Sequence, residues 1–296
     1  MTPSYEVAPA TFKPCIDYLV DAGMGPGNAV YVALGAGGEH MMLSTEERKL
    51  VAESAVAASA GRLPVFVGVA SNSTREAVEL ARHADHIGAD GLQVEPPYYF
   101  NCTAQEIFEY FQAISEAVSI GITAYNTPWA SGFHMDSSFL DRLAGLDNVI
   151  GLKWYADSSR EYVSVIRRYS RRFNIVNNYG GVMNADAFLH GVVGFVSQAA
   201  NFAPRVNLRI LALLRAKQFE AATELYMQSE NLYYDALGDL HREGFSGEGN
   251  FIKACMPLVG LDCGPARLPQ RRPSPWFADR MRQMIESVGE FRLAVH

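Results

Sequence analysis

Residues 64–95 read PVFVGVASNSTREAVELARHADHIGADGLQVE and contain one complete strand–helix–strand unit. The first end of this stretch, residues 64–69, is an apolar run rich in valine, and the second, residues 91–95, is a short run that follows turn residues; both patterns are consistent with strands. Between them a helix is expected whose apolar stripe consists of Ala77, Leu80, Ala81 and Ala84. Buried strands that alternate with such helices indicate parallel strands joined by helical crossovers.

The same alternation extends outward from this unit in both directions. It predicts seven strands, at residues 29–34, 64–69, 91–95, 121–125, 149–153, 173–177 and 193–197. The predicted fold is therefore an α/β (β/α)8 barrel. A helix expected near residues 10–22 leaves little room for the first strand. Either that strand is missing, or residues 2–7 form a short remnant, or the chain starts downstream of its natural initiation point.

Three helix starts carry the spacing of a capping box, in which a hydroxyl and a carboxylate satisfy free backbone NH groups. The pairs are Ser44 with Glu47, Ser73 with Glu76, and Thr103 with Glu106.

The alternation stops beyond Lys217, where helical stretches near residues 218–240, 249–259 and 275–288 follow. We therefore expect a catalytic barrel at residues 1–217 and a C-terminal helical domain at residues 218–296. Residues 264–273 are rich in proline and favour an irregular connection over a basic binding patch.

Composition excludes several classes of partner. The chain has 296 residues, 49% of them hydrophobic, and a net charge of −7, so no basic field favours nucleic acid. Neither a signal peptide nor an apolar run long enough for a membrane span is evident, which favours a cytoplasmic protein that binds no membrane. The four cysteines have no C-x-x-C spacing and are expected to be free, buried thiols.

Catalytic side chains of an α/β barrel lie at the carboxyl ends of its strands. The strand at 149–153 ends in Lys153 among apolar neighbours, where desolvation would supply the neutral amine that carbonyl addition needs. A lysine that extends into solvent is an equally good interpretation of this feature. The strand at 121–125 ends in Tyr125, whose phenol could relay protons or simply pack. The cluster at 96–100, PPYYF, is typical of a core or a subunit interface.

Taken in order, these strand-end motifs are specific. They are GAGGE at 35–39, PYY at 97–99, YNTP at 125–128, GLK at 151–153 and GVVGFVS at 191–197. Over nearly its whole length the chain resembles the dihydrodipicolinate synthase and N-acetylneuraminate lyase family. The resemblance implies a barrel with a C-terminal helical domain, a homo-oligomer that is usually a tetramer, and class I lyase chemistry. It implies Lys153 as the Schiff-base lysine, Tyr125 as the proton-shuttling phenol, and Tyr99 as a phenol supplied across a subunit contact.

The resemblance also implies a site for the 2-oxo acid carboxylate in the loop at 35–39, formed by Ala36, Gly37, Gly38 and Glu39. Members of the family have hydroxyl groups where this chain has Ala36-Gly37. Backbone NH groups of Gly37 and Gly38 can still bind an anion. The hydroxyl links of both the carboxylate site and the proton relay are absent, however.

Other departures concern the rest of the pocket. Residues 128–132, PWASG, lack the arginine that binds the second carboxylate in the synthase branch, which argues against aspartate semialdehyde as a substrate. His40 is either an acid–base group or incidental. Residues that could contact a substrate are Trp154, Tyr155, Asn177, Asn178, Tyr179, Val196 and Gln198, most of them polar or aromatic.

Three functions remain open at this point. A Schiff-base aldolase or dehydratase for a hydroxylated 2-oxo acid, such as a deoxy sugar acid, fits the polar strand ends best. A hydratase-aldolase for an aromatic or apolar substrate fits Trp129, Trp154 and Tyr155. A non-catalytic 2-oxo acid binding protein would explain the missing loop hydroxyls. No metal and no cofactor are expected, because the sequence has no metal-ligand spacing and a Schiff base is itself an electron sink.

Overall fold

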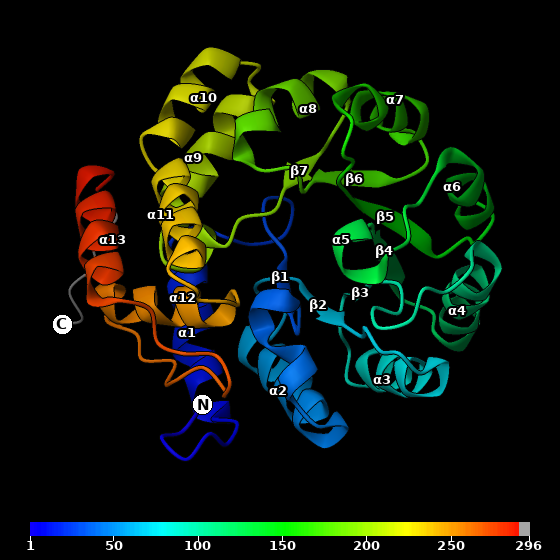
Figure 1. Cartoon of the computed structure of the whole chain (residues 1–296), viewed down its shortest axis with the longest axis horizontal. Helices are drawn as coiled ribbons and strands as arrows, with labels where there is room; N and C mark the ends of the chain where they lie inside the picture. The colour runs from blue at the N-terminus through cyan, green and yellow to red at the C-terminus, as the bar shows by residue number, and fades with distance from the viewer. Residues whose placement is uncertain (290–296) are drawn as a thin grey trace.

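The computed structural model describes residues 1–289, in which seven parallel strands form one curled sheet (Figure 1). The strands pair in chain order. They are β1 Tyr31–Ala33, β2 Val65–Gly68, β3 Gly91–Val94, β4 Gly121–Tyr125, β5 Val149–Trp154, β6 Asn174–Asn177 and β7 Gly194–Phe195. Each predicted strand is present, although β1 and β7 are shorter than expected.

Helices surround the sheet and cover its outer face (Figure 1). They are α1 Phe12–Asp21, α2 Thr45–Ser59, α3 Thr74–His86, α4 Ala104–Ala117, α6 Ser137–Leu143, α7 Ser159–Tyr169 and α8 Asn184–His190. The short α5 Pro128–Ser131 lies inside this ring (Figure 1). The predicted stripe of α3 is almost fully buried and belongs to a core cluster that extends from Ala33 to Val192. The predicted α/β barrel class is confirmed.

The sheet ends at β1 and β7, which do not pair with each other in the described part of the chain. Within residues 1–289 no strand precedes β1, and the Thr2 NH donates to the Glu6 carbonyl across a turn. The alternative of a remnant strand at residues 2–7 is therefore wrong. Val30 and Val32, beside the open edge, are 48% and 39% exposed.

Two of the three predicted capping boxes form, at Ser44 and Thr103. Ser73 occupies the N-cap position of α3 but accepts no hydrogen bond from the helix, so this prediction was wrong. The Glu76 carboxylate accepts instead from the hydroxyls of Ser71 and Thr45, each at 2.6 Å. These two hydroxyl donors occupy both oxygens of the carboxylate that the box would require.

A second core cluster, from Ala199 to Ile285, holds the C-terminal helices together. These are α9 Pro204–Arg215, α10 Phe219–Met227, α11 Glu230–Arg242, α12 Gly249–Cys255 and α13 Pro275–Ser287. The expected helix at 218–240 is thus two helices, and residues 264–273 are irregular as predicted. The domain boundary at Lys217 stays a prediction, and α9, which precedes it, packs with the second cluster. No helix in residues 1–289 is long and apolar enough to cross a membrane.

All four cysteines are free thiols, but only Cys255 is buried. The Sγ atoms of Cys15, in α1, and Cys263 lie 3.5 Å apart although the two residues are far apart in the sequence. The expectation of four buried thiols is therefore wrong for Cys15, Cys102 and Cys263, which are partly exposed.

Candidate active site

Lys153 and Tyr125 meet at the carboxyl end of the sheet. They are direct partners in the register of β4 and β5, so their side chains lie on the same face. The Lys153 Nζ atom is 3.7 Å from the centroid of the Tyr125 ring. The structure thus brings together the two residues that the sequence indicated as nucleophile and phenol.

Burial shifts the pKa values of both groups toward their neutral forms. Desolvation lowers the pKa of Lys153 to about 8, and the negative charges of Glu95 and Glu248 oppose this shift. An amine with this pKa has a useful neutral fraction near physiological pH, as nucleophilic addition requires. Burial likewise raises the pKa of Tyr125 well above its ordinary value, so the phenol keeps its proton.

Asn178 fixes the orientation of the Tyr125 phenol. Its Nδ2 group donates a hydrogen bond of 3.1 Å to the Tyr125 Oη atom. Because that oxygen already accepts a hydrogen bond, its own O–H is left to donate toward another group. A bound carbonyl or hydroxyl oxygen is the kind of acceptor that this arrangement suits.

The loop at 35–39 contains a short 3-10 helix, η2 Ala36–Gly38. Some of the backbone NH groups of this loop therefore donate hydrogen bonds to carbonyls of the same loop. The Gly38 NH donates to the Gly35 carbonyl at 2.8 Å and is therefore not available to an anion, contrary to expectation. Within residues 1–289 the NH groups of Ala36 and Gly37 donate no such bond. The candidate anion donors are thus Ala36 and Gly37.

Glu39 does not point into the site. Its side chain is only 2% exposed, and its Oε2 atom pairs with Lys253 Nζ of α12 at 2.9 Å. The backbone at Glu39 is left-handed, with φ of 59°, which turns the chain toward α12. Its predicted contact with substrate is therefore replaced by an ion pair that joins the 35–39 loop to the helical region.

Three polar residues of the site were missed by sequence reasoning. Gln93 and Glu95 lie on the same face at the end of β3, and Gln93 Nε2 donates to Glu95 Oε1 at 2.8 Å. Glu248, just before α12, interacts electrostatically with both Lys153 and Tyr125. Polar residues with a spacing of two in an otherwise apolar strand could have indicated the first pair. Glu248 is too distant in the sequence for any such signal.

Asn177 and Trp154 lie on the opposite face from the amine. Trp154 follows Lys153 directly in β5 and is fully buried in the core cluster of the barrel. Asn177 accepts from the Tyr162 hydroxyl at 2.6 Å and donates to Asn184 at 2.7 Å. These contacts leave both residues out of the site, and Asn178 provides the amide that reaches Tyr125.

Val196 and Gln198 follow β7 and are held by structural hydrogen bonds. The Val196 NH donates to the Asn177 carbonyl at 3.0 Å. Gln198 Oε1 accepts from the hydroxyl of the buried Tyr233 at 2.8 Å. His40 is buried, its pKa is lowered mainly by desolvation, and its Nδ1 atom lies 3.3 Å from the Gly35 carbonyl, which favours a neutral structural histidine.

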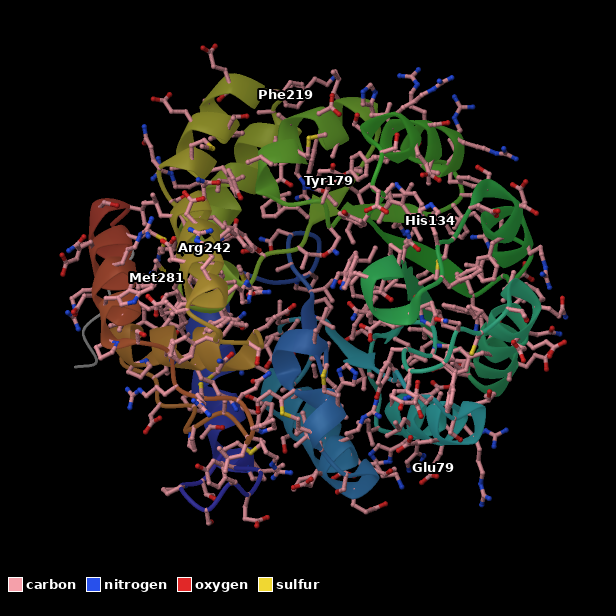
Figure 2. All side chains as sticks on the ribbon, viewed as in Figure 1. Glu79, His134, Tyr179, Phe219, Arg242 and Met281 are labelled. Carbon is pink, nitrogen blue, oxygen red and sulfur yellow. The ribbon has the colours of Figure 1, made fainter. Side chains whose placement is uncertain are left out.

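Aromatic rings form a continuous series beside Tyr125. Trp129 contacts Tyr125 and Tyr155, at centroid separations of 6.1 and 4.9 Å, and Tyr155 stacks on Tyr179. Tyr179 lies within the ring of helices (Figure 2). Tyr99 is 79% exposed and contacts Phe100 edge-on, so within one chain it lies outside this series.

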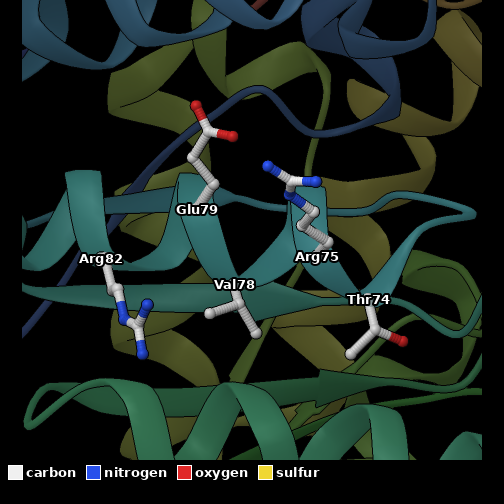
Figure 3. A pocket seen from close by; sticks show the side chains of 5 residues that line it. All are labelled: Thr74, Arg75, Val78, Glu79 and Arg82. Atoms are coloured by element: carbon white, nitrogen blue, oxygen red, sulfur yellow. The ribbon is translucent and has the colours of Figure 1, made fainter.

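A surface pocket along α3 has a different character (Figure 3). Its lining residues Arg75, Val78 and Arg82 are on the helix face opposite the buried stripe. It therefore lies outside the ring of helices, and neither Lys153 nor Tyr125 lines it.

A barrel of parallel strands with a lysine of lowered pKa beside a protonated phenol is an arrangement suited to class I lyases, in which a lysine forms a Schiff base with a carbonyl substrate. The model of the dihydrodipicolinate synthetase family matches residues 1–287, and the chain belongs to this family. The protein is therefore a class I Schiff-base lyase that acts on 2-oxo acids. The family and enzyme class predicted from the sequence are confirmed.

Individual relatives differ in function. A 4-hydroxy-tetrahydrodipicolinate synthase from Halorhodospira halophila is 32% identical over 282 residues, which cover 95% of this chain and 91% of the relative. A probable 2-dehydro-3-deoxy-D-pentonate aldolase from Escherichia coli K12 is 31% identical over 257 residues, covering 86% and 82%. Among solved structures, a prophage protein of the same family from E. coli K12, in complex with pyruvate, has a TM-score of 0.85 and 25% identity, with 98% and 95% of the chains covered.

Proposed function

We propose that this lyase cleaves or dehydrates a hydroxylated 2-oxo acid of the deoxy sugar acid type through a Schiff base at Lys153. The observation that carries the proposal is the contact of the Lys153 amine with the Tyr125 ring, at 3.7 Å, in a site edged by Asn178 and Glu95. A neutral amine adds to the ketone, and the phenol exchanges a proton with the substrate oxygen. The resulting iminium withdraws electrons from the bond that breaks.

The polar groups around the amine support a substrate with hydroxyl groups. Gln93 and Glu95 present an amide and a carboxylate from β3, and Asn178 presents a second amide beyond β6. Carboxylates and amide oxygens accept hydrogen bonds from hydroxyls. The name of the E. coli aldolase, 31% identical to this chain, points to the same class of substrate.

Aspartate semialdehyde, by contrast, is disfavoured as a partner. Residues 128–136, which follow the Tyr125 motif, contain neither arginine nor lysine. The histidine of this segment, His134, is hydrogen-bonded to Asn126 and Glu161. A second substrate carboxylate would therefore approach Glu95 and Glu248 without a bidentate partner.

A hydratase-aldolase for an aromatic aldehyde fragment is the second candidate. The rings of Trp129, Tyr155 and Tyr179 form a wall beside Tyr125, and Trp129 is 58% exposed. Such rings suit an offset or edge-on contact with a flat substrate. Trp154, which the sequence also indicated, is fully buried and takes no part in this wall.

The decisive experiment is borohydride reduction in the presence of pyruvate and a panel of hydroxylated and aromatic 2-oxo acids, followed by peptide mass analysis. We expect mass gain at Lys153 and its loss in Lys153→Ala. Cleavage or dehydration of hydroxylated acids alone supports the first candidate, and turnover of aromatic acids alone supports the second. Absence of labelling with every acid would instead support a non-catalytic binding protein.

We also propose that the protein is a homo-oligomer, a dimer or a tetramer, in which the exposed Tyr99 contacts a second copy. Light scattering, which measures the mass of the particle in solution, tests this proposal.

A further inference from the structure

Glu248 occupies the N-cap position of α12 without capping the helix. A carboxylate at this position commonly accepts a hydrogen bond from the first turn. Here the side chain accepts none. Its Oε2 atom lies instead 3.7 Å from the place that a Cβ atom on Gly37 would take, so the carboxyl faces the 35–39 loop.

The position of Glu248 is fixed by close packing. A Cβ atom on the neighbouring Gly249 would lie 2.8 Å from the Gly37 carbonyl and from Glu39, so the loop and the start of α12 are in direct contact. The ion pair of Glu39 with Lys253 holds the next turn of α12 against the same loop. These contacts hold the backbone at Glu248 against the 35–39 loop.

Charged and titratable groups surround Glu248 from several elements. Lys153 acts on it from β5, Glu95 from the end of β3, and His241 from α11. Glu248 in turn acts on Tyr125 in β4. Burial is the main reason that the pKa of Glu248 is raised, and Glu95 adds to this effect whereas Lys153 and His241 oppose it. The acid form is thereby favoured relative to an exposed glutamate.

Schiff-base formation has a step that needs such an acid. The neutral Lys153 amine adds to the ketone, a C–N bond forms, and a proton moves from nitrogen to oxygen to give a carbinolamine. Its hydroxyl then leaves as water only after it is protonated. Tyr125, with its raised pKa, is a weak acid at neutral pH, and the loop at 35–39 offers no hydroxyl.

We propose that Glu248, supplied by the C-terminal helical region, is the general acid that protonates the departing hydroxyl of the carbinolamine at Lys153. The carboxyl gives up its proton, the C–O bond breaks, water leaves, and the nitrogen lone pair forms the iminium. Hydrolysis of the product imine runs the step backward and returns the proton to Glu248. The inference rests on the proposed Schiff base at Lys153.

The test compares Glu248→Gln with the wild type in rapid-quench borohydride trapping with pyruvate, across pH 6 to 9. Loss of a general acid should slow trapping by roughly 10²-fold or more. It should also remove the fall in wild-type rate at high pH, an effect that a merely structural role would not produce. Glu248→Asp should restore part of the rate. Glu220→Gln, at an exposed glutamate of α10, is the matched control and should leave rate and profile unchanged.

Each outcome has a distinct meaning. A Glu248→Gln variant that traps pyruvate at the wild-type rate, with the same pH profile, would overturn the role of Glu248 and leave the Schiff base intact. A wild-type enzyme that traps no 2-oxo acid would overturn both proposals. If Glu248→Gln unfolds, judged by circular dichroism, Glu248→Asp decides: a rate and profile unlike those of the wild type support the role, and identical ones refute it.

Discussion

The amine of Lys153 rests against the face of the Tyr125 ring, with Nζ 3.7 Å from its centroid. This contact exists because the two residues are register partners on adjacent parallel strands. It places an amine whose pKa is lowered beside a phenol that keeps its proton, at the carboxyl end of the sheet.

The pH dependence of labelling should reflect the pKa of Lys153, which burial lowers to about 8. Below that pH the amine is protonated, and above it the acid form of Glu248 is depleted, so the rate of reductive trapping should rise toward about pH 8 and fall beyond it. Glu95→Gln removes a charge that raises this pKa, so its profile should move to lower pH. A profile centred near 10, as for an exposed lysine, would contradict the assignment.

Loss of the Tyr125 hydroxyl should affect turnover more than binding. Because a proton relay acts in the transition state, Tyr125→Phe should lower kcat by roughly 10²-fold or more with little change in KM. Asn178→Ala, which removes the amide that orients the phenol, should have a smaller effect in the same direction. A rise in KM alone would assign the phenol to binding.

Affinity should depend on the length of the 2-oxo acid. Hydroxyl groups are absent from residues 35–39, and a hydrogen bond to a charged group contributes about 1.5–3 kcal/mol, so pyruvate should bind roughly 10- to 100-fold more weakly than it would with such a bond. Five- and six-carbon acids should regain affinity through Gln93, Glu95 and Asn178. Dissociation constants measured on Tyr125→Phe test this, and equal values across the series would refute it.

The ion pair between the buried Glu39 carboxylate and the partly exposed Lys253 should matter for stability. Lys253→Met leaves the Glu39 carboxylate buried without its cation, which typically costs about 3–5 kcal/mol. The double variant Glu39→Gln/Lys253→Met should recover part of this loss. Lys13→Met, which breaks a pair on the exposed face of α1, should change the free energy of unfolding by less than about 0.5 kcal/mol. Denaturant unfolding measures all three, and equal effects of Lys253→Met and Lys13→Met would contradict the prediction.

Cys15 and Cys263 should form a disulfide when the protein is treated with glutathione disulfide, because their Sγ atoms are already 3.5 Å apart. The two thiols are oxidised and the reagent is reduced to two glutathione molecules. Non-reducing peptide mapping should find the crosslink between α1 and the segment after α12, and Cys15→Ser should abolish it. Glutathionylation of Cys102 alone would show that the pair is not accessible.

Sequence periodicity predicted the strands well because a buried parallel strand must be a short apolar run. It also placed Lys153 and Tyr125 at the carboxyl ends of their strands, which is where the structure has them. It failed where one residue decides the face of the sheet: Trp154 and Asn177 were expected in the site, but their neighbours Lys153 and Asn178 are the residues that reach Tyr125. Ser73 failed as a cap because Thr45, distant in sequence, competes for Glu76. Glu248 depends on tertiary packing, which local patterns do not encode.

Because α12 packs on the 35–39 loop, binding of substrate in the barrel should stabilise this C-terminal helix against local unfolding. The start of α12, which belongs to the second core cluster, packs against the 35–39 loop of the barrel. A 2-oxo acid bound at Lys153 would therefore stabilise the barrel and α12 together, although the two could otherwise unfold locally and separately. A ligand at 100 times its dissociation constant adds about 2.7 kcal/mol to the free energy of any local unfolding that abolishes binding. Amide hydrogens of α12 should therefore exchange more slowly when substrate is bound, although they lie outside the barrel strands that carry the nucleophile.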